Sequence, residues 1–242
     1  VIRDITGMES TGEGHVLRAG DCSFNNLGVS TCFMLSSTMP QDLVKEKGYH
    51  PVGGCGGNIA WHTEDDTMEI ADRDNLLRDM RVYAATLLRT LNAPVAPFDY
   101  RATVAEMSDA VTEYAAAAGD AFDFSPTRER LTELRAALDT FYDHAATLNA
   151  TSDPEALRAA NATQRKLARI LVSLCYTRDG RFRQDPARAI PALPDLSPAR
   201  QLPDADDHMR NVILTTLLRG QNRTTWELEQ AVGLVGQAGV GS

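Results

Sequence analysis

The sequence predicts an α/β part over residues 1–95, followed by an all-α four-helix bundle over residues 96–242. Three observations support this division. A short apolar run at residues 29–35 has the composition of a buried strand in a parallel sheet. Two prolines then interrupt the helical periodicity within residues 92–99. Beyond them the apolar residues recur with a helical period, and no segment has the pattern of a strand.

The remainder of the α/β part predicts one long loop and one helix. Residues 36–58 have the composition of a loop, and the glycines of Gly-Gly-Cys-Gly-Gly at residues 53–57 lack the lysine of a phosphate-binding loop. Asp72 or Asp74 can cap the helix that follows. We expect the apolar face of this helix to pack on the sheet. That face consists of Leu76, Leu77, Met80, Ala84, Leu87, Leu88 and Leu91.

The second part contains several helical patterns separated by proline signals. Pro126 follows Ser125, and Asp153 precedes Pro154, which are helix-start signals. Residues 176–204 are rich in proline and arginine and predict an irregular insertion. The patterns lie at residues 104–118, from residue 126, from residue 154, and at residues 209–219 and 225–235. We interpret them as a four-helix bundle with one insertion.

Composition excludes some functions and leaves others open. The net charge of -9 argues against nucleic acid as a partner, because no basic stripe is available to neutralise phosphates. No run of 18 apolar residues is present, so no membrane span is predicted. The four cysteines lack a CxxC spacing, which favours buried free thiols over a zinc-thiolate site or a disulfide. Free thiols favour a reducing, cytoplasmic compartment.

The most informative stretch is Trp-His-Thr-Glu-Asp-Asp-Thr at residues 61–67. A histidine such as His62 can place a neutral imidazole nitrogen on a metal ion, and the polar residues after it can hold the loop backbone. An ordinary loop histidine is the alternative for an isolated residue of this kind. Asp65 or Asp66 can orient the loop or simply cap the surface backbone. The loop alone leaves both interpretations of His62 open.

Three segments, taken in order, resemble one family. They are Gly-Asp-Cys-Ser-Phe-Asn-Asn-Leu-Gly-Val-Ser at residues 20–30, the 61–67 loop, and Ala-Pro-Val-Ala-Pro-Phe-Asp-Tyr-Arg at residues 93–101. Together they are similar to the zinc aminopeptidase and glutamate carboxypeptidase family. The resemblance is to the branch that carries a transferrin-receptor-like dimerisation domain. It implies a parallel-sheet zinc exopeptidase fold for residues 1–95 and a homodimerising bundle for residues 96–242.

The resemblance also implies a chemistry that this chain supplies only in part. Members of the family bind two zinc ions, which activate water for hydrolysis of a peptide bond. Their other metal ligands and their general base precede the point that corresponds to Val1, so His62 is the one ligand expected here. We therefore expect the chain to be the C-terminal portion of a larger peptidase. On its own it should be inactive.

The expected substrate pocket includes Trp61, Asp21 and Asn25. Related carboxypeptidases have a tyrosine before the histidine, whereas Trp61 can donate only through its indole N–H. This difference favours aminopeptidase-like hydrolysis over release of glutamate. Asp21 and Asn25 can line the pocket or cap the turn into the strand.

The arginines of the insertion have two possible roles, and two functions other than a peptidase are considered. Arg178, Arg181 and Arg183 can approach the pocket from a bundle or a partner subunit, or can be solvated surface charge. One alternative function is a non-catalytic dimerisation or receptor-like module of the same family. Another is a separate helical binding domain unrelated to peptidases, which the proline-containing linker at residues 93–101 argues against.

Overall fold

The computed structural model describes residues 1–9, 25, 27–29, 41–49, 60, 63–178 and 191–239. It divides the chain into two compact units. Unit 1 comprises Val1–His15 and Cys32–Asn92, and unit 2 comprises Val16–Thr31 and Ala93–Ser242. Regular structure in the described ranges is entirely helical. The predicted strand at residues 29–35 lies outside those ranges apart from Val29, so the α/β architecture stays a prediction.

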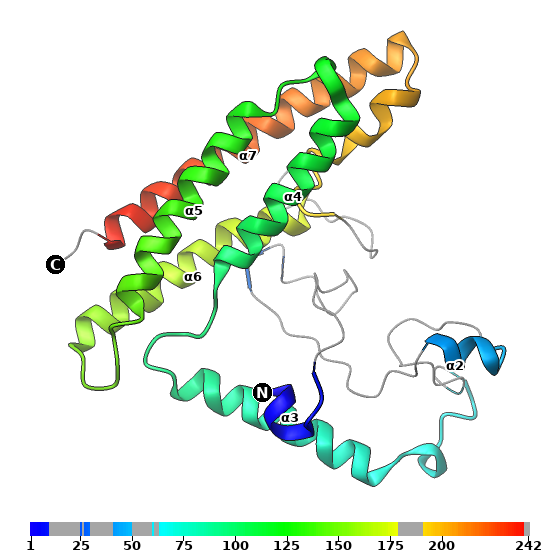
Figure 1. Ribbon diagram of the computed structural model, residues 1–242, viewed down its shortest axis with the longest axis vertical. Helices are drawn as coiled ribbons and strands as arrows, with labels where there is room; N and C mark the ends of the chain where they lie inside the picture. Colours follow the sequence, from blue (N-terminus) through cyan, green and yellow to red (C-terminus); the bar gives the residue numbers. More distant parts are fainter. Residues whose placement is uncertain are drawn as a thin grey trace. The chain divides into compact units, whose positions relative to one another are not determined.

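Unit 1 contains α1 (Ile2–Thr6), α2 (Gln41–Glu46), the 3₁₀ helix η2 (Met68–Ile70) and α3 (Arg73–Asn92) (Figure 1). The prediction of an uninterrupted loop at residues 36–58 was wrong, because α2 lies within it. Asp42 in the first turn of α2 and Lys45 in its last turn both match the helix dipole. The buried side chain of Val44 anchors this short helix.

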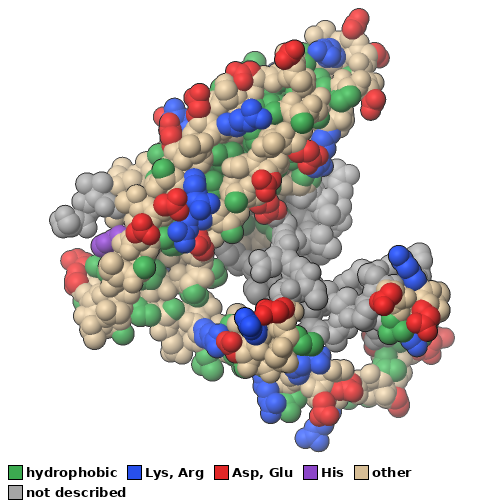
Figure 2. Space-filling model, viewed as in Figure 1, with side chains coloured by type: hydrophobic (Ala, Val, Ile, Leu, Met, Phe, Trp, Pro, Cys, Tyr) green, Lys and Arg blue, Asp and Glu red, His purple; other side chains and the backbone are tan. Residues whose placement is uncertain are grey.

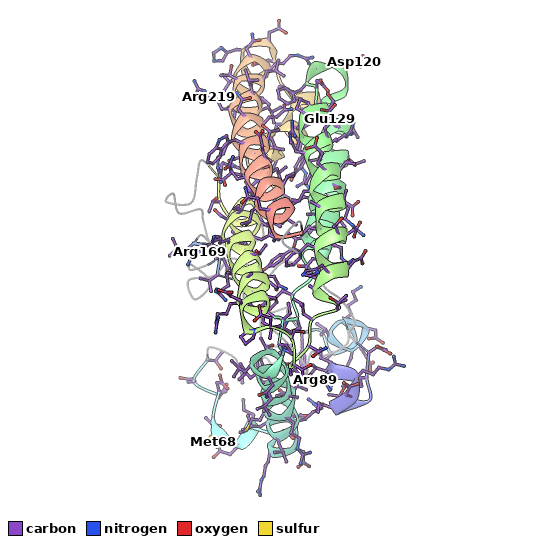
Figure 3. All side chains as sticks on the ribbon, turned by 90° about the vertical axis from the view of Figure 1, so that its left-hand side faces the viewer. Met68, Arg89, Asp120, Glu129, Arg169 and Arg219 are labelled. Carbon is purple, nitrogen blue, oxygen red and sulfur yellow. The ribbon has the colours of Figure 1, made fainter. Side chains whose placement is uncertain are left out.

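Helix α3 begins where the sequence predicts and leaves its apolar face uncovered. The Asp72 carboxylate accepts a hydrogen bond from the backbone N–H of Asn75 at 2.7 Å, which confirms the predicted cap. The opposite side of the helix buries Val82, and α3 contacts α1, where Arg89 pairs with Asp4 at 2.7 Å. Figure 3 labels Arg89 on this helix and Met68 on the segment before it. The exposed large hydrophobic side chains of α3 are Leu76, Leu77, Met80, Tyr83, Leu87, Leu88 and Leu91.

Unit 2 is built from four long helices, and an aspartate lies one or two residues before the start of each. The helices are α4 (Tyr100–Ala118), α5 (Ser125–Ala145), α6 (Pro154–Tyr176) and α7 (Asp207–Gly239). Asp99, Asp123, Asp153 and Asp206 each accept a backbone N–H from the first turn, at 2.7–3.3 Å. These bonds satisfy donors that a helix start leaves free. The cap predicted at Asp153 is confirmed.

The four helices form the predicted bundle around one apolar core. Helix α7 packs against α5, α6 and the 3₁₀ helix η4 (Ser197–Asp204), while α4 packs against α5 and η4. The short η3 (Gly119–Ala121) continues the end of α4. The largest fully buried side chains of the bundle are Met107, Tyr114, Phe124, Leu134, Leu138, Phe141, Leu167, Leu171, Leu193, Leu196, Leu217 and Leu228.

Helix α7 corrects the expectation of two separate helices at residues 209–219 and 225–235. It runs without interruption for 33 residues. Gly220 lies inside it, where glycine ordinarily costs a helix about 1 kcal/mol relative to alanine. A Cβ atom at this position would lie 2.7 Å from the carbonyl oxygen of Asp195. Gly220 therefore permits a close approach of α7 to the turn before η4 and does not end the helix.

The surface of the bundle mixes charges of both signs. Acidic and basic side chains alternate over the face visible in Figure 2, without a large area of either sign. Within the described ranges, no helix combines the length and the apolar character needed to cross a membrane.

Candidate functional site

The loop before α3 is held by its own backbone and by Thr63. The Thr63 hydroxyl donates to the carbonyl oxygen of Ala60 at 2.6 Å and accepts the backbone N–H of Asp65 at 3.2 Å. The backbone N–H of Thr63 also donates to the Ala60 carbonyl at 2.9 Å, and that of Asp66 donates to the Thr63 carbonyl at 3.2 Å. A chain of consecutive turns thus leads from Ala60 to the start of α3.

The carboxylates of this loop point to solvent. Asp65 and Asp66 are both exposed, on the segment that follows the predicted ligand. A hydrogen bond with the Thr67 side chain lowers the pKa of Glu69 below its usual value. Trp61 and His62 themselves lie outside the described residues. The ligand role of His62 and the orienting role of Asp65 or Asp66 therefore stay predictions.

Asn25, predicted to line the substrate pocket, belongs to unit 2, and its side chain is 1% exposed. Neither side-chain amide atom has a hydrogen-bond partner among the residues that the structure describes. The backbone N–H of Gly28 donates to the carbonyl of Asn25, and a Cβ atom at Gly28 would lie 2.1 Å from the Cα atom of Arg169. This turn therefore packs directly on α6. Asp21, the third predicted pocket residue, lies outside the described part of the chain.

The described residues do not form a complete metal site. No three histidine, cysteine, aspartate or glutamate side chains among them lie close enough together to hold a metal ion. The described donors alone therefore do not fit a two-zinc centre. Cys175 is a free thiol, and burial among apolar neighbours raises its pKa, which disfavours the thiolate that binds metals. Cys22, Cys32 and Cys55 are outside the described ranges.

The ends of the predicted insertion are fastened to the bundle. The half-buried Arg178 donates to the Ser197 hydroxyl at 3.2 Å, so its guanidinium is engaged within unit 2. The hydroxyl of Tyr114 donates to the carbonyl of Ala192 at 2.7 Å from the core. Arg181 and Arg183 lie outside the described residues, and their proposed approach to a substrate stays a prediction.

A buried ion pair beside the insertion was not predicted from the sequence. The guanidinium of Arg223 on α7 contacts the carboxylate of Asp195, whose side chain is 7% exposed, and donates to the Thr177 hydroxyl at 2.9 Å. The pair joins α7 to the end of α6 and to the turn before η4. The helical pattern of α7 was the available signal, because Arg223 adjoins Thr224 on the side of the helix that faces the bundle. Its partner is 28 residues away and could not be identified from local pattern.

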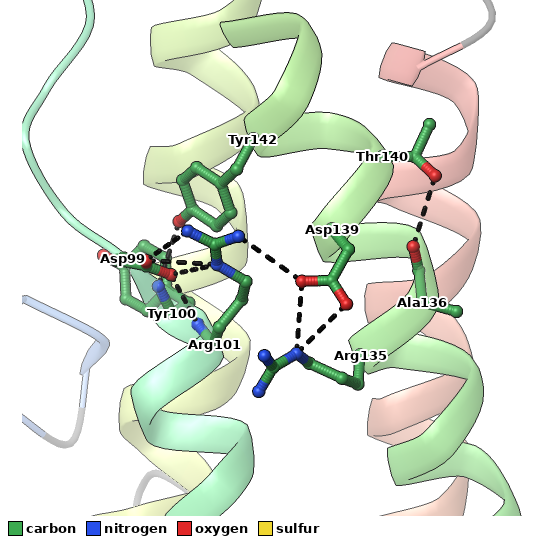
Figure 4. Close-up of polar contacts among 8 residues, drawn as sticks. All are labelled: Asp99, Tyr100, Arg101, Arg135, Ala136, Asp139, Thr140 and Tyr142. Carbon is green, nitrogen blue, oxygen red and sulfur yellow. Dashed lines mark hydrogen bonds and ion pairs between the residues drawn. The ribbon is translucent and has the colours of Figure 1, made fainter. Parts of the chain in front are cut away.

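The linker at residues 93–101 ends in a second, more exposed network (Figure 4). Arg101 pairs with Asp99 at 2.6 Å and with Asp139 at 3.4 Å, and Arg135 pairs with Asp139 at 3.2 Å. The Arg101 guanidinium also lies over the ring of Tyr142, whose hydroxyl accepts the backbone N–H of Tyr100 at 3.0 Å. The linker is thereby attached to α5.

This network predicts a change of stability with pH. Hydrogen bonds from Arg101 lower the pKa of Asp99 below its ordinary value of 3.8. A carboxyl whose pKa is lower in the folded state stabilises the fold above the unfolded-state pKa, and the contribution disappears as pH falls through the folded-state pKa. We expect the stability of Asp99→Asn to fall less steeply below pH 4 than that of the wild type, measured by urea unfolding. Parallel profiles would contradict this role for Asp99.

The described residues thus place a turn-rich loop directly before an amphipathic helix in unit 1, and a capped bundle in unit 2. Comparison of this chain with models of protein families, with curated proteins and with solved structures found no match.

Proposed function

We propose that this chain is the C-terminal portion of a co-catalytic zinc exopeptidase. Residues 1–95 would complete its α/β catalytic domain, and residues 96–242 would form its homodimerising bundle. His62 would supply one nitrogen ligand, and residues beyond those described would supply the others. Two zinc ions would provide the activated water, and hydrolysis would be aminopeptidase-like because Trp61 replaces the tyrosine of the carboxypeptidase branch.

The uncovered apolar face of α3 supports this proposal most directly. Met80 is 60% exposed and Leu91 is 78% exposed. The other side of the helix carries Arg78, Asp79 and Arg89. Monomeric proteins seldom expose contiguous apolar patches larger than a few hundred Å². A helix of this kind is suited to cover one face of a parallel sheet. Helix α3 follows the proposed ligand loop closely in sequence, so its packing on the sheet would also hold that loop in place.

Exposure of this face can be tested with a hydrophobic dye. We expect the purified chain to bind 8-anilinonaphthalene-1-sulfonate through α3, because this dye reports accessible apolar surface. Fluorescence should fall markedly in a Leu87→Lys/Leu88→Lys variant. The control is Leu218→Lys, which removes one exposed leucine from α7 and should leave most of the signal. Equal fluorescence in both variants and the wild type would contradict an accessible α3 face.

The metal role of His62 predicts the order in which the histidines respond to zinc. We expect its imidazole resonances to shift at a lower Zn²⁺ concentration than those of the exposed His144 and His208, because only His62 is proposed as a metal ligand. Asp143 and Asp207 directly precede the two control histidines, so a neighbouring carboxylate alone would not produce this order. Nuclear magnetic resonance during a Zn²⁺ titration measures this. His62→Ala should abolish the first response, while His208→Ala should retain it. A simultaneous response of all three histidines would contradict the ligand role.

Zinc binding separates the proposal from its alternative, a non-catalytic receptor-like module of the same family, whereas an enzymatic assay tests whether the chain suffices for catalysis. We expect the isolated chain to hydrolyse no peptide, because it supplies only one of the expected metal ligands. Chelator-sensitive hydrolysis that His62→Ala removes would show that its residues suffice for catalysis. Absence of zinc binding that depends on His62 would favour the receptor-like module, because that alternative lacks working metal ligands.

A further inference from the structure

We draw no further inference here: the strongest candidate, the exposed apolar face of helix α3, belongs to the surface on which the proposed function already rests, and nothing in the described part of the chain shows what else covers it.

Discussion

Replacing Arg223 with methionine is expected to destabilise the bundle by roughly 3–5 kcal/mol, the range measured when one partner of a buried ion pair is removed. The Asp195 side chain is only 7% exposed, so water cannot replace the interaction of its carboxylate with the guanidinium once Arg223 is gone. The substitution also removes the donor to the Thr177 hydroxyl. Urea unfolding followed by circular dichroism measures the loss.

Two further variants identify the cause of that loss. Asp195→Asn in the Arg223→Met background should recover part of it, because a neutral amide is less costly to bury than a carboxylate. Arg219→Met removes an exposed arginine one helical turn earlier, labelled in Figure 3, and should change stability by no more than about 0.5 kcal/mol. An Arg223→Met effect as small as that of Arg219→Met would show that the pair carries little stability.

The second large effect is expected at Phe141, near the C-terminal end of α5. Phe141 is 1% exposed and contacts the ring of Tyr142 edge-on, with ring centroids 5.1 Å apart. Phe141→Ala removes this contact and leaves a cavity, so we expect a loss of about 3–5 kcal/mol in the free energy of unfolding.

Its matched control is the neighbouring residue on the same helix. Thr140 is exposed, and its hydroxyl donates to the carbonyl of Ala136, as Figure 4 shows. Thr140→Ala should change the free energy of unfolding by no more than about 0.5 kcal/mol. Both variants can be compared by thermal and urea unfolding. A Phe141→Ala loss as small as the effect of Thr140→Ala would mean that the packing of Phe141 contributes little to stability.

Local sequence predicted α3, α4, α5 and α6 because their start signals and apolar stripes are local, whereas α1 and α2 were missed and α7 was predicted as two helices. Asp72 and Asp153 lie three residues before the N–H groups that they accept, so each cap could be recognised without knowledge of the fold. The apolar stripes of the bundle were recognisable for the same reason, since residues three and four apart share one helix face. These signals predicted a helical bundle after residue 96.

Features that depend on distant contacts were missed. Gly220 resembles a helix break in sequence, and only the turn at Asp195 explains why glycine belongs inside α7. The buried pair of Arg223 with Asp195 depends on the same approach. The candidate site likewise combines local features, which the sequence predicts, with features that depend on distant residues. The turns around Thr63 are local, whereas the ligands that would complete a metal centre with His62 must come from elsewhere.

The central position of α7 has a consequence for the order of events during synthesis. It is the last bundle helix to be made, yet it packs against α5, α6 and η4. Until it leaves the ribosome, the apolar stripes of these elements have no complete set of partners. Nascent chains that lack α7 would therefore expose core surface to chaperones and proteases. A frameshift within α7 would affect the whole bundle rather than only its final turns.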